Sequence, residues 1–319
     1  MPKIAITGAS GKLGGAVLRN LLSHALIPPH DIVVTTSSGT PDDPRWQHAR
    51  SLGVAVRHAS YDDRGSMEAA FRGCSRLLLV STPRISMDFD DAPLGAGREA
   101  HHIAAIDAAR AAGVRRVYYT SLGFGDDSVA GVMRAHNRTE AYLRSLGPDD
   151  IAHTIVREGL YNESWPLYLG HGDLSGSDDR GEIVVAGDGA ISWAAIDDLG
   201  LATATILVAE GDDDGYAGAT VMLATTAPVT LREVAAMVSA AKGRRVELKV
   251  VGRAEHERYY VEERGVEAAY VRWWSTTYDA VRDGECEKRD PLLKRILAGY
   301  DGRKPKPIRE TIEEMFARQ

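Results

Sequence analysis

The chain has 319 residues, of which 44% are hydrophobic and 26% are charged, and its formal net charge is −7. This composition is typical of a globular protein. The negative charge argues against a nucleic-acid partner, because phosphate binding needs a basic face. No apolar stretch has the length of a membrane span. The N-terminal residues lack the pattern of a secretory signal, and the only cysteines are Cys74 and Cys286. We therefore expect a cytoplasmic protein whose cysteines are reduced and which does not contact a membrane.

Strand and helix patterns alternate along the first half of the chain. In chain order we expect a strand over 4–7, a helix over 13–24, a strand over 31–36, a helix over 45–52, a strand over 54–59, a helix over 66–71, a strand over 76–81, a helix over 99–112, a strand over 116–121, a helix over 135–146 and a strand over 153–157. This alternation predicts an α/β fold with a Rossmann-type, doubly wound parallel sheet. Ligands of such sheets bind at the carboxyl ends of the strands.

The second half of the chain is less regular. It contains an expected helix over 198–209, a strand over 219–224 that could return to the sheet, and a helix over 230–241. Thr230 and Glu233 form a capping-box pattern at the start of that last helix. The remaining tail is expected to be largely helical.

These elements suggest two parts. We expect residues 1–157 to form an NAD(P)-binding Rossmann core to which 197–225 return, and 158–196 with 226–319 to form a smaller C-terminal α+β substrate-binding lobe. The adjacent Trp273 and Trp274 in this lobe either wall a pocket for a flat substrate or anchor the packing of the lobe.

A glycine-rich loop follows the first strand and opens the first helix. Gly8, Gly11 and Gly14 have the spacing of a dinucleotide-binding loop. One glycine permits the tight turn, another lets backbone amides approach the pyrophosphate, and the third permits close packing of helix on strand. The helix N-terminus adds a positive dipole end. The loop predicts a bound nicotinamide dinucleotide.

The residues after the second strand bear on which dinucleotide is bound. An acidic residue there would bind the ribose 2′-hydroxyl of NAD, but the sequence reads Thr36-Ser37-Ser38. Lys12 and Arg45 are nearby cations that could meet a 2′-phosphate. We therefore expect NADP(H), with NAD(H) as the alternative, in which case both cations are solvated surface charges.

The loop Thr7-Gly8-Ala9-Ser10-Gly11-Lys12-Leu13-Gly14-Gly15 resembles that of the NmrA-like, atypical short-chain dehydrogenase/reductases. Within this family the sequence is most similar to the NAD(P)H:quinone oxidoreductase and triphenylmethane reductase type. The similarity runs along nearly the whole chain, including residues 108–114, 119–122, 156–161 and 187–189 and Gly302-Arg303-Lys304-Pro305.

The resemblance implies roles for particular residues. Those assigned to the cofactor are Gly8, Ser10, Gly11, Lys12, Leu13 and Gly14 at the pyrophosphate, Ser37 and Ser38 at the adenosine ribose, Asp62 at the adenine, Ser81, Thr82 and Pro83 where the chain passes over the cofactor, Thr120 and Ser121 beside the nicotinamide, and His136, Gly159 and Leu160. Asp62 has an alternative role as the N-cap of the helix that follows it.

The sequence departs from the wider superfamily at the catalytic positions. Typical members use a serine, a tyrosine and a lysine, and the tyrosine acts as general acid and base. Ser121 matches the serine, but Val132 stands in the tyrosine position and His136 in the lysine position. The resemblance implies that this loss is shared with the family's quinone reductases. Reduction of a quinone yields a weaker base than an alkoxide, so positioning and electrostatic stabilisation suffice.

The candidate catalytic residues are therefore His136, Ser121 and Tyr161. His136 could donate a proton near neutral pH, or it could hold a ribose or backbone group without taking part in the chemistry. His101 and His102 lie within a helix without metal-ligand spacing, so we expect no metal site.

We favour an NADPH-dependent reductase of a quinone or similar flat, conjugated carbonyl compound. One alternative is a non-catalytic binder that senses NAD(P) and regulates partners. Another is a redox-neutral isomerase or ring-opening enzyme that acts on an aromatic, polyketide-like substrate. The sequence leaves the oligomeric state open.

Overall fold

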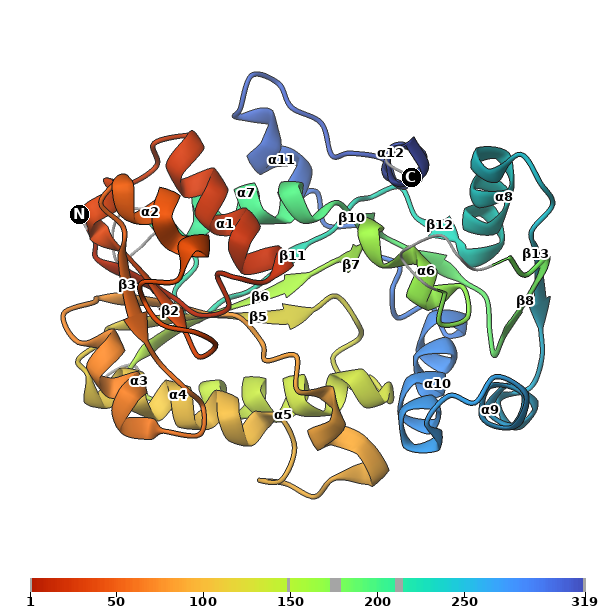
Figure 1. The fold of residues 1–319 in the computed structure, drawn as a ribbon, viewed down its shortest axis with the longest axis horizontal. Coiled ribbons are helices and arrows are strands. Elements are labelled where there is room, and N and C mark those ends of the chain that lie inside the picture. Colours follow the sequence, from red (N-terminus) through yellow and green to blue (C-terminus); the bar gives the residue numbers. More distant parts are fainter. Residues whose placement is uncertain (1, 148–149, 173–178, 210–214, 318–319) are drawn as a thin grey trace.

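The fold is built on one parallel sheet of seven strands, as Figure 1 shows for the computed structural model. The structure describes residues 2–147, 150–172, 179–209 and 215–317. In spatial order the strands are β11 (Thr220–Leu223), β6 (Ala152–Glu158), β5 (Arg116–Leu122), β4 (Arg76–Leu79), β1 (Ile4–Ile6), β2 (Ile32–Thr36) and β3 (Ala55–His58). All neighbours pair in parallel. The order reverses between β1 and β4, which confirms the predicted Rossmann-type topology.

Helices cover both faces of the sheet (Figure 1). The helices on one face are α1 (Lys12–Ser23), α7 (Ile196–Val208) and α11 (Leu292–Ala298), with α2 (Gln47–Ser51) beside the edge strands, and those on the other face are α3 (Arg64–Phe71), α4 (Glu99–Ala111) and α5 (Gly131–Ser145). The central strands β1 and β2 are buried along their whole length, because helices exclude water from both sides. Helices α1 and α7 touch closely, since a Cβ added to Gly200 would lie 2.6 Å from the Cβ of Ala16.

Several boundaries differ from those expected from the sequence. Helix α5 begins at Gly131 rather than at 135, because its first turn packs directly against a later helix. A Cβ added to Gly131 would lie 2.7 Å from the carbonyl oxygen of Trp273. Helix α7 begins at Ile196, so Asp198 lies in its first turn. The capping box is confirmed, with both hydrogen bonds between Thr230 and Glu233 present.

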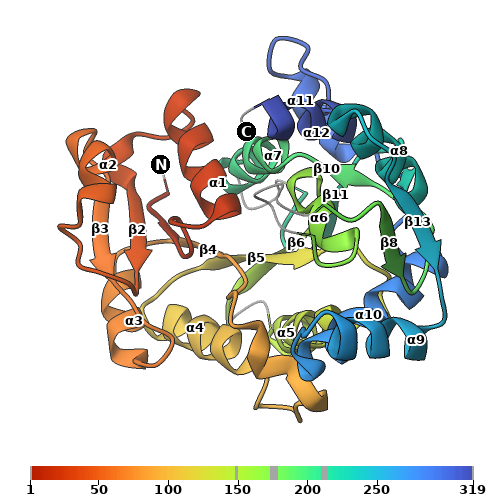
Figure 2. The same ribbon diagram turned by 45° about the vertical axis from the view of Figure 1, so that its right-hand side comes forward.

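The remaining elements form a second apolar core beside the carboxyl ends of the strands (Figure 2). The helices are α6 (Trp165–Tyr168), α8 (Leu231–Lys242), α9 (Arg253–Arg258), α10 (Ala268–Arg282) and α12 (Ile308–Ala317), and the paired strands are β7 (Leu160–Tyr161) with β10 (Trp193–Ala194), β9 (Ala190–Ile191) with β12 (Val229–Thr230), and β8 (Glu182–Val185) with β13 (Glu247–Val250). Trp273 and Trp274 are buried in this core. Phe124 and Met133 from the first half join it, so the two halves of the chain pack as one body.

Within the described ranges, no helix combines the length and the apolar character needed to cross a bilayer.

Candidate functional site

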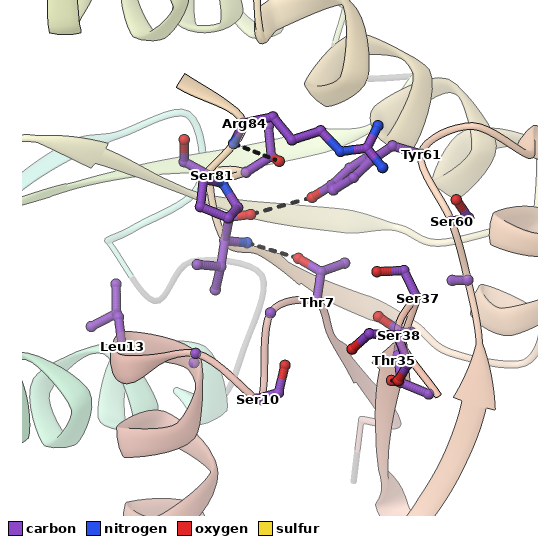
Figure 3. A pocket seen from close by; sticks show the side chains of 18 of the residues that line it. Thr7, Ser10, Leu13, Thr35, Ser37, Ser38, Ser60, Tyr61, Ser81 and Arg84 are labelled. Atoms are coloured by element: carbon purple, nitrogen blue, oxygen red, sulfur yellow. Dashed lines mark hydrogen bonds between the residues drawn. The ribbon is translucent and has the colours of Figure 1, made fainter. Parts of the chain in front are cut away.

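A cavity of about 490 Å³ lies at the carboxyl ends of β1, β2, β3 and β4 (Figure 3). It contains the point where the strand order reverses. Of the residues singled out in the sequence, those that line it are Gly8, Ser10, Gly11, Lys12, Leu13, Gly14, Ser37, Ser38, Ser81, Thr82, Pro83 and Tyr161. Loops far apart in the chain thus meet at one cavity.

The glycine loop forms one wall of this cavity. Gly8 adopts a left-handed φ of +64°, which glycine accepts without a steric penalty. The amide of Gly11 donates to the carbonyl of Gly8 at 2.9 Å. A Cβ added to Gly14 would lie 2.4 Å from that same carbonyl oxygen. Gly11 is also the N-cap of α1 and supplies no side-chain cap. The first-turn amides of α1 are therefore open to a diphosphate, which fits a dinucleotide.

A pair of hydrogen bonds holds the opposite wall, as Figure 3 shows. The hydroxyl oxygen of Thr7 accepts from the amide of Val80 at 2.9 Å, and the hydroxyl of Tyr61 donates to the carbonyl of Val80 at 3.3 Å. Burial raises the pKa of Tyr61 to about 12, so it keeps its proton and remains a donor. Tyr61 lines the cavity beside β3, although no sequence motif pointed to it.

One cation contacts the end of the cavity formed by Ser37 and Ser38, and another lines the cavity wall. Nη1 of Arg45 donates to the hydroxyl of Ser38 at 3.3 Å. The guanidinium of Arg45 also pairs with the Asp43 carboxylate at 2.9 Å, which lowers the pKa of Asp43. Lys12 lines the cavity and has no hydrogen bond or ion pair with any residue that the structure describes. The charge at this end suits a phosphate better than a bare ribose hydroxyl.

Asp62 does not cap helix α3 and pairs with Arg84 instead. Its two carboxylate oxygens accept from Nη1 and Nη2 of Arg84, both at 2.7 Å. This pair holds the pKa of Asp62 below its usual range. Arg84 lines the cavity, whereas Asp62 lies beside it. The N-cap of α3 is Asp63, whose carboxylate accepts from the amide of Ser66, so the alternative role proposed for Asp62 was wrong. Adjacent aspartates cannot be told apart by spacing alone.

Thr120 and Ser121, at the end of β5, are buried and do not line the cavity. The Thr120 hydroxyl oxygen accepts from the amide of Ser81 at 3.1 Å, so Thr120 supports the cavity wall from behind. The Ser121 hydroxyl donates to the carboxylate of Glu140 at 2.6 Å. The side chain of Ser121 thus points toward α5.

His136 also lies outside the cavity and is only 2% exposed. Its Nδ1 is 2.9 Å from the hydroxyl of Tyr119. Burial, with the nearby positive charge of Arg98, lowers the pKa of His136 well below its ordinary range. The imidazole is therefore neutral at physiological pH, and it is poorly suited to donate a proton there.

His102 connects this buried region to the cavity wall, a role that no sequence pattern predicted. Its Nε2 accepts from the amide of Thr82 at 3.1 Å and lies 3.3 Å from the Ser81 hydroxyl. The Nδ1 therefore carries the proton. It lies 3.2 Å from the hydroxyl of Tyr119, which in turn contacts His136. A buried row of polar groups thus runs from Ser81 to His136.

Gly159 turns the chain from β6 into β7. A Cβ there would lie 3.0 Å from the carbonyl oxygen of Leu223 and 3.1 Å from that of Ser192. This turn places Leu160 in the second core and brings Tyr161 to the cavity. Burial, and the neighbouring Glu158, raise the pKa of Tyr161 above its ordinary value. Its phenol keeps its proton and can donate a hydrogen bond.

A second cavity of about 510 Å³ lies between the end of β11, α8 and the segment 305–310. None of the residues singled out in the sequence as catalytic or cofactor-binding lines it. Within the described part of the chain, no group of three or more histidine, cysteine or acidic side chains is placed to hold a metal ion.

Comparison with known proteins gives a consistent result. The model of the NmrA-like family matches residues 2–265. The NmrA-like family domain-containing oxidoreductase flvB of Aspergillus flavus is 30% identical over 98% of this chain and 94% of its own length. Quinone oxidoreductase 2 of Escherichia coli is 31% identical, with 79% of each chain covered. The crystal structure of Citrobacter triphenylmethane reductase complexed with NADP(H) superposes with a TM-score of 0.78 at 29% identity, covering 98% of this chain and 99% of that one.

Proposed function

Because the chain belongs to the NmrA-like family, we propose that it is an NADPH-dependent reductase of a quinone or a similar flat, conjugated carbonyl compound. The observation that carries this proposal is the cavity at the strand ends. It combines an open glycine loop with the cations Lys12 and Arg84 and a protonated tyrosine, Tyr161. Similar proteins named as a quinone oxidoreductase and a triphenylmethane reductase support the substrate class.

NADP(H) fits the cavity better than NAD(H). The described residues at the end of β2 offer hydroxyls but no carboxylate to a ribose 2′-hydroxyl. Lys12 and Arg45 would hold the 2′-phosphate, and Arg84 would add positive charge on the other side. The solved complex of the similar triphenylmethane reductase with NADP(H) supports the same choice.

The reduced nicotinamide, when bound, would supply the hydride. Tyr161 would donate a hydrogen bond to the oxygen on which negative charge develops, since its phenol lines the cavity and stays protonated. We assign positioning roles to Ser121 and His136, because both act through other residues. His136 would act through Tyr119 and His102 on the loop that carries Ser81. A hydroquinone anion is a weak base, so water can complete its protonation.

The test is NADPH oxidation with a panel of quinones, together with cofactor binding measured without an acceptor. We expect turnover with at least one quinone, and tighter binding of NADPH than of NADH. In a Lys12→Ala, Arg45→Ala variant the preference for NADPH should fall, while NADH binding should change little. Equal affinity for the two cofactors in the wild type would contradict the assignment of Lys12 and Arg45.

A second candidate is a binder that senses NADP(H) without turnover. The burial of Ser121 and His136 away from the cavity favours it, since such a protein needs the cofactor site but no acid or base. Tight NADPH binding without oxidation by any quinone would support this candidate over the reductase. Product formed without net consumption of NADPH would instead indicate an isomerase or ring-opening enzyme.

A further inference from the structure

The second cavity, of about 510 Å³, is separate from the cofactor cavity. Helices α8, α11 and α12 contribute to it, and they lie on the side of the molecule opposite to α3, α4 and α5 (Figure 1). Among the residues that the structure describes, none lines both cavities. The volume falls within the range of about 300–1,000 Å³ that is typical of small-molecule sites. The cavity is therefore large enough for a ligand of its own.

The base of this cavity is apolar. Trp193 is 2% exposed, and Ile308 is buried as well. The indole N–H of Trp193 donates to the carbonyl of Val229 at 3.1 Å, so the polar atom of this side chain already has a partner. Met237 and Pro305, both half-buried, also line the cavity. An occupant therefore needs an apolar body, and the indole and proline rings suit a flat one.

The rim of this cavity carries positive charge. The exposed Lys294 on α11 and Arg309 on α12 line it. Neither side chain has a hydrogen bond or an ion pair with any residue that the structure describes. Lys306 also lines the cavity, but its ammonium pairs with Glu314. Glu310 is the one acidic side chain among the described residues that line it. Cations beside low-dielectric walls in a concave surface concentrate an attractive field for an anion.

The start of α12 adds to this positive charge. The helix begins at Ile308, and its first turn, 308–310, lines the cavity. The first amides of a helix have no partner inside the helix. Pro307, which precedes the helix, has neither a hydroxyl nor a carboxylate with which to cap them. The positive end of the helix dipole thus lies in the same wall as Arg309.

Buried side chains hold this wall in place. The carboxylate of Asp198 accepts from the amide of Lys306 at 2.6 Å, and the side-chain amide of Asn162 donates to the carbonyl of Lys306 at 3.1 Å. Both Asp198 and Asn162 are buried. The cavity is therefore preformed, and a ligand does not have to order this segment before it binds.

We propose that this second cavity binds an aromatic monocarboxylate. The rings of the ligand pack against Trp193 in the base, and its carboxylate lies at the rim, where Lys294, Arg309 and the first amides of α12 bind it. Glu310 at the same rim disfavours a second negative charge on the ligand. The proposal does not rest on the reductase function, since it uses none of the residues that line the cofactor cavity.

The experiment compares the binding of 2-naphthoate and of the neutral 2-naphthamide by calorimetry, on protein saturated with NADPH so that the cofactor cavity is filled. One charge-assisted hydrogen bond corresponds to a preference of roughly tenfold for 2-naphthoate. The double variant Lys294→Gln, Arg309→Gln should lose most of this preference. The matched control is Arg295→Gln, Lys304→Gln, which makes the same change of net charge at exposed positions that do not line the cavity. This control should keep the preference.

Ala227→Trp tests the cavity independently of charge. Ala227 is exposed and lines the cavity, so a larger side chain there fills space without disturbing a core. The variant should weaken the binding of both naphthalene compounds.

Three results would overturn the proposal. The first is equal binding, or no binding, of the two compounds by the wild type. The second is an unchanged preference in the folded Lys294→Gln, Arg309→Gln variant. The third is displacement of 2-naphthoate by NADPH, which would place the ligand in the cofactor cavity. Because the readout is binding, an absence of NADPH oxidation would contradict the reductase function alone.

Discussion

The carboxyl group of Glu158 lies at the end of β6, fully buried. Its Oε1 accepts from the hydroxyl of Thr203 at 2.9 Å, while its Oε2 has no partner among the described residues. Burial raises its pKa from 4.5 to about 8. The group is therefore mostly protonated at neutral pH, and the fold tolerates it as a neutral acid.

This shift predicts a pH dependence of stability. The unfolded chain releases the proton near pH 4.5, but the folded chain keeps it until about pH 8. The free energy of unfolding should therefore fall as the pH rises through this window, by at most about 5 kcal/mol. Glu158→Gln should remove this dependence in urea unfolding at a series of pH values. The exposed Glu182→Gln should keep the wild-type profile, and a variant at 158 with that same profile would contradict the prediction.

At the glycine loop, Gly14→Ala tests the close approach of helix and turn. The new Cβ would lie 2.4 Å from the backbone oxygen of Gly8, so the loop must move. We expect a loss of stability of about 1–3 kcal/mol and a marked loss of NADPH affinity, measured by fluorescence titration. Gly252→Ala is the control, because its Cβ would have no neighbour within 4 Å. Unchanged NADPH affinity in Gly14→Ala would show that the loop does not hold the cofactor.

At the scale of elements, an ion-pair network joins α5 to the sheet. Arg157 on β6 donates to both carboxylate oxygens of Glu140 on α5, at 3.1 and 2.7 Å, and both residues are buried. Ser121 on β5 donates to the same carboxylate. The network explains why Ser121 points toward α5 rather than into the cavity.

Arg157→Met should therefore destabilise the protein by about 3–5 kcal/mol in urea unfolding, because it leaves the Glu140 carboxylate buried and short of positive charge. Arg144→Met removes a partner of the same carboxylate, but the Arg144 side chain is 48% exposed. That control should cost less than about 1 kcal/mol. Similar losses in the two variants would argue against a buried network.

At the scale of the molecule, the C-terminal segment ties the second core to the sheet. The buried Asp198 on α7 accepts from Arg303 at 2.6 Å and from the amide of Lys306 at 2.6 Å. The side-chain amide of Asn162 donates to the carbonyl of Lys306 at 3.1 Å. Segments that are far apart in the chain are thus held together next to the turn that carries Tyr161.

Asp198→Asn keeps the shape of the side chain but weakens these bonds. We expect a loss of about 1.5–3 kcal/mol and faster amide hydrogen exchange over 305–312. Asp197→Asn is the control, since Asp197 also pairs with Arg303 but is 54% exposed. Exchange over 305–312 that is equally slow in Asp198→Asn and the wild type would contradict the role of Asp198.

The sheet was predictable because its signals are local. Alternating strand and helix patterns, and glycines at the first turn, depend on neighbours within a few residues. Helix ends were less predictable. Gly131 opens α5 only because α10 packs against it, and a glycine by itself disfavours a helix start.

The candidate site was likewise predictable where its residues belong to local patterns, and not where distant contacts decide. The glycine loop and the hydroxyls after β2 and β4 line one cavity, because in a parallel sheet the loops that follow the strands meet at one edge. The direction of a side chain near that edge depends on its distant partners. Ser121 turns to Glu140 and His136 to Tyr119, and neither partner follows from spacing.

The amino-acid sequence was thus sufficient for the family, the doubly wound sheet and the position of the dinucleotide loop, since each follows from short-range patterns. It could not indicate that His102 supports the cavity wall or that His171 and His256 meet among tyrosines. Those groupings arise from long-range packing, which brings together residues that are distant in the chain and removes them from water. Burial and partners, rather than residue type, then determine the charge and the hydrogen-bonding capacity of each side chain.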